Sequence, residues 1–145
     1  MISVLEFNDL EKTVSDLLSN AKKRHSIYKE IFGNNSTKIA DENFFNNCDK
    51  YNKNGDVITL EKEVIYLVNN IDKKTLRNLF IIYEIGATSP DYKDPHKEYK
   101  NRLKDFKRNC QDEHYINKFI DKEYRHLKHS LCNGLDYARK NFIEK

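Results

Sequence analysis

Apolar residues recur every three or four positions along most of this chain, and that spacing is typical of amphipathic helices. The first stretch predicts a helix over about residues 9–32. Its apolar positions are Leu10, Val14, Leu17, Leu18, Ala21, Tyr28, Ile31 and Phe32. Asn8 and Glu11 are spaced like a capping box, and Gly33 suits the left-handed residue that ends many helices. Arg24 and the lysines around it fall toward the end of this helix, where the helix dipole favours cations.

Three further helices are predicted in the middle of the chain. A short helix over about 38–50 would bury the apolar positions Ile39, Phe44, Phe45 and Cys48. A third helix follows Thr59, and a fourth begins after Asp72, which can cap it, and ends at Gly86. This fourth helix is apolar nearly all round over about 75–85, so we expect it to be the central buried helix.

The last third of the chain begins with a segment, 87–95, that contains both prolines and is expected to be a loop. Beyond it the spacing predicts a basic helix over about 96–109 and a long helix over about 113–143. The fold class is therefore all-α. We expect a single-domain bundle of about five to six helices over residues 1–145, with a long C-terminal helix; the loop at 87–95 is the one place where the chain could subdivide.

Length and composition exclude several classes of protein. The 145 residues suit one domain, and no stretch approaches the roughly 20 apolar residues that cross a bilayer. The first residues lack the pattern of a signal peptide, so we expect a cytoplasmic location. Cys48, Cys110 and Cys132 are odd in number and have no Cys-x-x-Cys spacing, which favours neither a disulfide framework nor a zinc site. No glycine-rich phosphate loop occurs, and we expect no cofactor and no metal.

Charge is divided unevenly along the chain, although the net charge is only +3. Residues 1–89 carry 12 basic and 13 acidic residues, whereas residues 90–145 carry 14 and 10. In the predicted basic helix one side holds Lys97, Lys100, Lys104, Lys107 and Arg108, and the other holds Tyr99, Leu103 and Phe106. Such a stripe can bind phosphates or an acidic protein. We therefore expect charged recognition to lie after residue 90.

Residues 52–61 resemble the later part of a calcium-binding EF-hand loop. The residues that match are Asn52, Asn54, Gly55, Val57 and Glu61. The position of the first aspartate is occupied by Lys50, whose charge repels calcium. The sequence therefore favours a turn that ends at Thr59 as a helix N-cap, and leaves calcium binding open.

Residues 108–114 resemble the Arg-x4–6-His motif of HEPN-type helical ribonucleases, including the polar Asn109 after the arginine. In that family the histidine and arginine act without metal on the RNA 2′-hydroxyl and the scissile phosphate, usually across a dimer interface. The resemblance implies that Arg108 and His114 are catalytic. The alternative is structural, with Asp112 capping the last helix and His114 in its first turn.

A histidine-containing ladder lies near the start of the long C-terminal helix. Its residues are Glu123, His126, His129 and Cys132, each three positions after the one before. Steps of three drift by about 60° on an α-helix, so the two ends of the ladder point to opposite sides. This spacing favours a polar helix face over a metal site.

The leading interpretation is a small, non-catalytic helical module that acts by covering a protein partner. Inhibitors, immunity proteins and accessory proteins of bacterial or phage defence and conflict systems are of this kind. The expected binding residues are Tyr99, Lys100, Lys104, Lys107, Arg108, Arg125 and His129, with Tyr92 nearby. The alternatives are the metal-independent ribonuclease and RNA or DNA binding through residues 97–108. A homodimer is compatible with all three interpretations.

Overall fold

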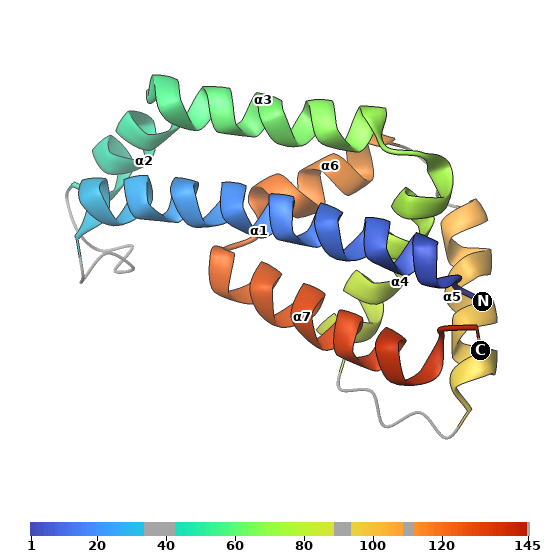
Figure 1. Cartoon of the computed structure of the whole chain (residues 1–145). Coiled ribbons are helices and arrows are strands. Elements are labelled where there is room, and N and C mark those ends of the chain that lie inside the picture. The colour runs from blue at the N-terminus through green and yellow to red at the C-terminus, as the bar shows by residue number, and fades with distance from the viewer. Residues whose placement is uncertain (34–42, 89–93, 109–111, 145) are drawn as a thin grey trace.

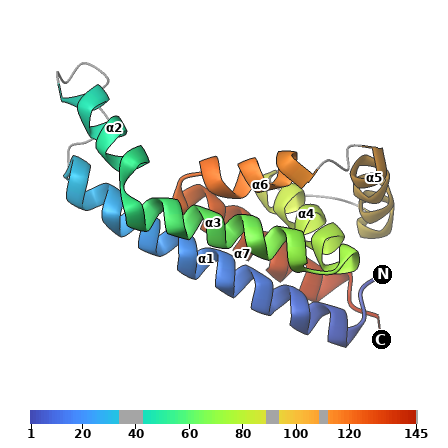
Figure 2. The ribbon, with the colours of Figure 1, turned by 90° about the horizontal axis from the view of Figure 1, so that it is seen from above.

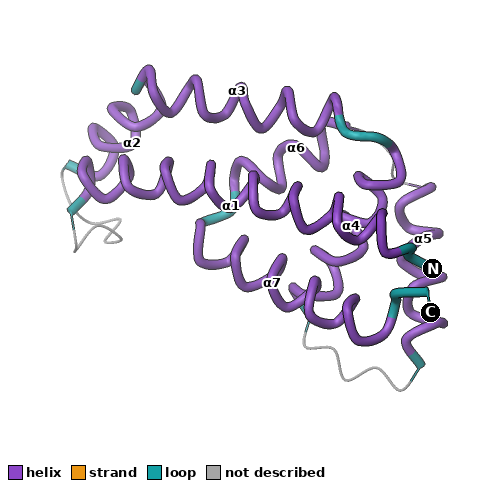
Figure 3. The backbone as a smooth tube through the Cα atoms, viewed as in Figure 1, coloured by secondary structure: helices purple, strands orange, loops and turns teal. Residues whose placement is uncertain are grey.

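The structure is a computed structural model that describes residues 1–33, 43–88, 94–108 and 112–144. Of residues 107, 108, 112–115 and 121 it describes the helical backbone alone. The described residues form seven helices, α1 (Val4–Phe32), α2 (Phe44–Lys53), α3 (Gly55–Asn70), α4 (Lys73–Ala87), α5 (Pro95–Arg108), α6 (Asp112–Asp121) and α7 (Tyr124–Asn141). The all-α prediction is confirmed, and Figure 3 shows that nearly all of the described residues are helical. None of the described helices is long and apolar enough to cross a membrane.

The first helix begins one turn earlier than the periodicity predicted. Ser3 is its N-cap: the Ser3 hydroxyl accepts from the Glu6 backbone N–H at 3.1 Å, and the Glu6 carboxylate accepts from the Ser3 N–H at 3.3 Å. The predicted cap at Asn8 is wrong because Phe7 is buried and extends the apolar face by a turn. The predicted end is confirmed, since Gly33 follows α1 at a φ of 71°.

Helices α2 and α3 meet at a single residue, Asn54. Its side-chain oxygen accepts from the backbone N–H groups of Asp56 at 2.9 Å and Val57 at 3.1 Å. The predicted cap at Thr59 is therefore wrong, because Thr59 lies inside α3 and donates to the Gly55 carbonyl. Since the chain is helical on both sides of Asn54, the twelve-residue loop of an EF-hand does not form here.

Helix α2 is less buried than the sequence predicted. It begins at Phe44, and residues 38–42 of the predicted helix lie outside the described residues. None of the residues of α2 is fully buried, and Phe45 is 72% exposed. Of the positions expected to be buried, Phe44 and Cys48 are half-buried, and Ile39 lies outside the described residues. Figure 2 shows why: α2 projects at the far end of α1, away from the bundle, where it packs mainly on α1 and α3.

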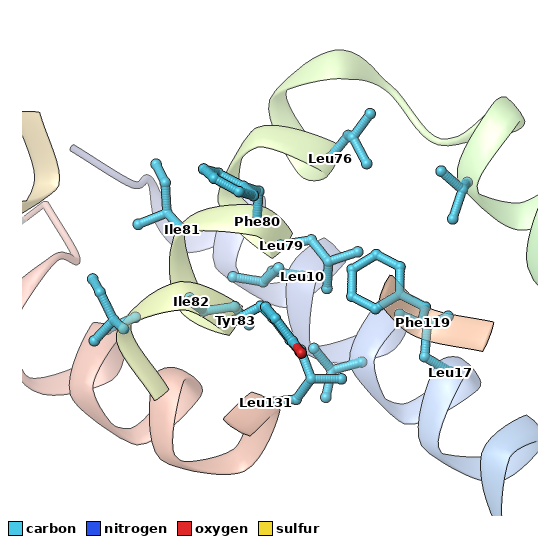
Figure 4. Close-up of a cluster of buried hydrophobic side chains, with 14 of the residues drawn as sticks. Leu10, Leu17, Leu76, Leu79, Phe80, Ile81, Ile82, Tyr83, Phe119 and Leu131 are labelled. Atoms are coloured by element: carbon cyan, nitrogen blue, oxygen red, sulfur yellow. The ribbon is translucent and has the colours of Figure 1, made fainter. Parts of the chain in front are cut away.

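Helix α4 is the central helix, as its apolar sequence predicted. Asp72 caps it by accepting from the Thr75 N–H at 2.7 Å, as expected. Its buried residues meet side chains of α1, α6 and α7, and Figure 4 shows Leu79, Ile82 and Tyr83 among Leu10, Phe119 and Leu131. A single cluster of buried apolar side chains draws on α1, α3, α4, α5, α6 and α7.

The most extensive helix pair is α4 with α7, and two glycines bring them together. A Cβ atom at Gly86 would lie 1.7 Å from the Ser130 carbonyl oxygen, and one at Gly134 would lie 1.9 Å from that of Ile82. Gly86 was expected to end α4, but the helix continues to Ala87. Both glycines lie within helices. Because they have no side chain, the backbones of α4 and α7 can come into direct contact at these two positions.

The predicted helix over 113–143 is divided into α6 and α7. A long C-terminal helix is present as α7, but the chain leaves the helical path at residues 122–123 and restarts with Glu123 as N-cap. The carbonyls of Phe119 and Ile120, in the last turn of α6, accept hydrogen bonds from Arg24 of α1. Carbonyls at a helix end need such partners, and here the partner comes from far away in the sequence.

Helix α5 lies beside the two chain ends (Figure 1). The Ile2 N–H donates to the Phe142 carbonyl at 3.0 Å, and the Glu144 N–H donates to the Ile2 carbonyl at 2.8 Å. The ring of Tyr99 from α5 packs edge-on against Phe142, with 5.2 Å between ring centroids. The backbone pairing of the ends thus forms part of the surface on which α5 rests.

A half-buried ion network also holds α5 and α6 to α4. Glu84 of α4 pairs with Lys118 of α6 and lies 3.9 Å from Arg102 of α5. The Lys118 ammonium also lies over the rings of Phe80 and Tyr83, at 5.4 and 5.6 Å from the ring centroids. The Glu84 carboxylate of α4 therefore interacts with basic side chains of both α5 and α6.

Adding a methyl group at either contact glycine should destabilise the fold. We expect Gly86→Ala and Gly134→Ala each to lower the free energy of unfolding by about 3 kcal/mol or more, because a backbone oxygen cannot move aside independently. The matched control is Gly55→Ala, which meets nothing within 4 Å at the start of α3 and should change stability by less than about 1 kcal/mol. Urea unfolding followed by circular dichroism measures the difference. Equal stability of Gly86→Ala and Gly55→Ala would contradict the close approach of α4 and α7.

Candidate functional site

A cavity of about 410 Å³ opens where α1, α2 and α3 meet the junction of α6 and α7. Residues from five helices and from the turn between α6 and α7 line it: Ala21, Arg24, His25, Tyr28, Tyr51, Asn52, Glu61, Ile120, Lys122, Glu123 and Tyr124. We call it the aromatic pocket, after the rings of His25, Tyr28, Tyr51 and Tyr124. Its volume is within the range of small-ligand sites.

A buried polar network supports one side of the aromatic pocket. Arg24 is only 4% exposed and donates to the carbonyls of Ile120 at 2.9 Å and Phe119 at 3.2 Å. Its Nε donates to Asn20 Oδ1 at 2.8 Å, and Asn20 Nδ2 donates to the Leu60 carbonyl at 2.8 Å. The network therefore fixes α1, α3 and the end of α6 relative to one another. Arg24 was expected to complement the dipole of its own helix, but it satisfies the carbonyls of α6 instead.

The aromatic side of the pocket is a chain of ring contacts. The His25 ring lies nearly parallel to Tyr28, with centroids 6.3 Å apart, and stacks on Tyr124 at 5.8 Å. The ring of Tyr51 packs edge-on against Tyr28, with 5.7 Å between centroids, and the ring of Phe32 stacks on that of Tyr28, with 4.2 Å between centroids. These rings come from α1, α2 and α7. Because each ring contacts the next, the rings form one continuous wall of the pocket.

Burial in the pocket shifts the pKa of two groups. The pKa of His25 lies below its ordinary value of 6.5, chiefly because of desolvation and secondly because of the charge of Lys29. The pKa of Tyr51 is raised above 10.0, again mainly through desolvation. At neutral pH the pocket therefore presents a neutral imidazole and a protonated phenol. Charged side chains of both signs, Glu61, Lys122 and Glu123, also line it.

This arrangement suits binding. Ring faces supply apolar contact area, and hydroxyl, imidazole and carboxylate groups supply hydrogen bonds at the edges, which is the usual composition of a recognition pocket. Among the residues that the structure describes, no three histidine, cysteine, aspartate or glutamate side chains gather as a metal site would require. In the predicted ladder of Glu123, His126, His129 and Cys132, the Nε2 atom of His126 lies 3.7 Å from the Glu123 carboxylate, and Cys132 is half-buried.

The binding residues predicted from the sequence do not form one surface. Tyr99 is only 6% exposed, so the expectation that it lies on the surface is wrong. Lys100 and Lys104 are exposed on α5, and Arg125 and His129 are exposed on α7. Helix α5 packs against Phe142 at the end of α7. Arg125, at the start of α7, is about 25 Å from Phe142 along the helix axis, so it is far from the lysines of α5.

The ribonuclease candidates fall on residues that the structure describes only in part. Arg108 ends α5 and His114 lies in the first turn of α6, but their side chains, and that of Lys107, lie outside the described residues, as do residues 109–111 and Tyr92. The HEPN-like reaction therefore stays a prediction. RNA or DNA binding through 97–108 and a homodimer likewise stay predictions.

In the comparisons with known proteins, no protein family, no curated protein and no solved structure matches this chain. Its function must therefore be inferred from its own chemistry. The aromatic pocket was not predicted from the sequence, although the sequence holds one signal of it. Asn20 and Arg24 are polar residues at helical spacing on the apolar face that holds Leu17 and Ala21. Polar residues in such places are buried only with partners.

Removing the Arg24 guanidinium should loosen the junction that it supports. We expect Arg24→Met to lower the free energy of unfolding by about 2–4 kcal/mol, because the carbonyls of Phe119 and Ile120 lose their partner while still buried. Arg125→Met is the control, since Arg125 is exposed, and it should cost less than about 0.5 kcal/mol. Thermal and urea unfolding provide the measurement. Similar losses in both variants would show that the network adds nothing.

The lowered pKa of His25 should be visible in solution. We expect its ring protons to titrate below pH 6.5 in NMR spectra, with the signal identified by its loss in His25→Gln. Because the unfolded chain takes up this proton more readily than the folded chain, stability from this group is complete above pH 6.5 and is lost as pH falls through the folded pKa. His25→Gln should flatten that part of the pH dependence. A titration at or above 6.5 would contradict the desolvation of the ring.

Proposed function

We propose that this chain is a non-catalytic helical binding module that acts by covering a protein partner, with the aromatic pocket receiving one or two partner side chains. The observation that carries the proposal is the pocket itself. Four rings from three helices surround a cavity of about 410 Å³ that charged side chains also line. Tyrosine and arginine are the residues in which protein interfaces concentrate their binding energy.

The pocket is suited to tight binding because it is rigid before binding. The ring contacts place Tyr124 against His25 and Tyr51 against Tyr28, and the Arg24 network ties α1, which carries His25 and Tyr28, to α3 and the end of α6. Binding then costs little side-chain entropy, so more of the contact energy remains as affinity. An apolar or aromatic side chain entering the cavity would also gain from leaving water.

The charged groups that line the pocket would set the orientation of the partner. Glu61 and Glu123 can accept hydrogen bonds from basic or polar partner groups, and Lys122 can pair with an acidic one. The hydroxyl of Tyr51 is protonated at neutral pH, as tyrosine hydroxyls ordinarily are, and it can donate a hydrogen bond. Such groups favour one partner over others more than they add affinity.

A small module of this kind acts by occupying its partner's surface. In the finer form of the proposal, it is a cytoplasmic inhibitor, immunity or accessory protein of a bacterial or phage defence or conflict system. Two features support this form: the composition of the pocket suits recognition, and a domain of this size can block a partner by contact alone.

The proposal predicts that a stoichiometric protein partner binds through the aromatic pocket. The partner would be isolated with the tagged chain from its native host, purified, and titrated by calorimetry. We expect Tyr51→Ala and Tyr124→Ala to weaken binding at least about 30-fold, as hot-spot residues do. The matched control is Tyr66→Ala on α3, because Tyr66 is 71% exposed and lies outside the pocket.

Three results would contradict this proposal. One is the failure of any partner to co-purify in stoichiometric amount. Another is binding that Tyr66→Ala weakens as much as Tyr51→Ala does, with both variants folded by circular dichroism. The third is cleavage of RNA in the presence of EDTA that is lost in His114→Ala, which would establish catalysis in place of simple covering.

A further inference from the structure

A second cavity, of about 330 Å³, lies between α4, α5 and the start of the chain. Its lining is Met1, Arg77, His96, Tyr99, Lys100 and Leu103. We call it the Arg77 pocket. It is far from the aromatic pocket: the start of α1 and His25 are separated by about 30 Å along that helix. Figure 1 shows α5 and the chain ends together at one end of the molecule, away from α2.

Arg77 is a half-buried arginine with no partner among the residues that the structure describes. It makes no hydrogen bond or ion pair with any residue that the structure describes, and its Nε is enclosed with no acceptor. Other arginines of the bundle are paired: Arg24 with carbonyls, and Arg102 with Glu98 at 3.0 Å. A guanidinium that is partly removed from water without an acceptor is unfavourable, and an anion would relieve that cost.

Two more basic groups line the same cavity. His96 and Lys100 are four residues apart on α5, so they lie on one face of that helix and face the cavity together. The hydroxyl of Tyr99 donates to the Met1 carbonyl at 3.4 Å. The cavity therefore brings together an arginine from the central helix and a lysine and a histidine from α5.

The carboxylates of this region already have partners. Glu6 caps α1 through the Ser3 N–H and lies 3.9 Å from Lys74. Glu144 accepts from the Met1 amino group at 2.6 Å. Neither carboxylate lines the cavity, and Arg77 forms an ion pair with neither. The Arg77 pocket thus holds basic groups with no acidic side chain among its lining residues.

We propose that the Arg77 pocket binds the phosphate group of a small phosphate monoester. A phosphate offers several oxygens and close to two negative charges, so it can engage a guanidinium fork and an ammonium at once. A carboxylate carries one charge and suits a single arginine. The apolar side chains of Leu103 and Met1 provide a surface for the organic part of the ligand, and the volume suits a small molecule.

Calorimetric titration of the full chain with phenyl phosphate tests this site, and benzoate is the matched carboxylate. We expect phenyl phosphate to bind at least about tenfold more tightly than benzoate, and Arg77→Gln to weaken its binding about tenfold or more. Lys100→Gln should weaken binding several-fold. The matched control on the same helix is Lys97→Gln, since Lys97 is exposed and does not line the cavity, and it should leave binding unchanged.

Several outcomes would overturn the proposal. They are no heat with phenyl phosphate at about 10 mM, equal binding of benzoate, or equal effects of Lys97→Gln and Lys100→Gln. Tight binding of a single-stranded RNA without a terminal phosphate, weakened alike by both lysine variants, would assign the helix to nucleic-acid binding instead. If Arg77→Gln does not fold, the lysine pair still decides. Tyr51→Ala should leave phosphate binding unchanged, so this site and the aromatic pocket are tested separately.

Discussion

The close contact of α4 with α7 is the constraint on which the rest of the structure depends. It exists because Gly86 and Gly134 allow the backbone of one helix to touch the other, and any side chain at either position would collide with a carbonyl oxygen. Once this pair is set, α4 is enclosed and the two ends of α7 have fixed places. One end brings Tyr124 to the aromatic pocket, and the other brings Phe142 to Ile2 and Tyr99.

A second constraint is polar. Arg24 and Asn20 are buried on the apolar face of α1, and they are satisfied only by groups from α3 and α6. Such a network adds little net stability when it is complete, but it is costly when a partner is missing, so it excludes alternative arrangements of the helices. Here it also holds the turn between α6 and α7 beside α1, and that turn supplies Lys122 and Glu123 to the aromatic pocket.

The two cavities differ in chemistry as well as in position. The aromatic pocket offers ring faces and charged groups of both signs, whereas the Arg77 pocket offers basic groups from two helices. We propose a protein partner for the first and a phosphate for the second. Of the basic groups that line the Arg77 pocket, His96 and Lys100 lie after residue 90, where the sequence has its excess of basic residues.

The sequence by itself determined the helical fold, the central place of α4, the cap at Asp72 and the end of α1 at Gly33, because periodicity and capping act within one or two turns. It did not determine the break after α6. The backbone carbonyls of Phe119 and Ile120 at that break accept hydrogen bonds from Arg24, which lies 95 and 96 residues away in the sequence. Gly86 looked like a helix end because local rules cannot detect a second helix that requires a glycine. Likewise Tyr99 packs on Phe142 and donates to the Met1 carbonyl, both of which are far from it in the sequence. Both pockets join residues from distant segments, so the tertiary structure alone decided which side chains meet.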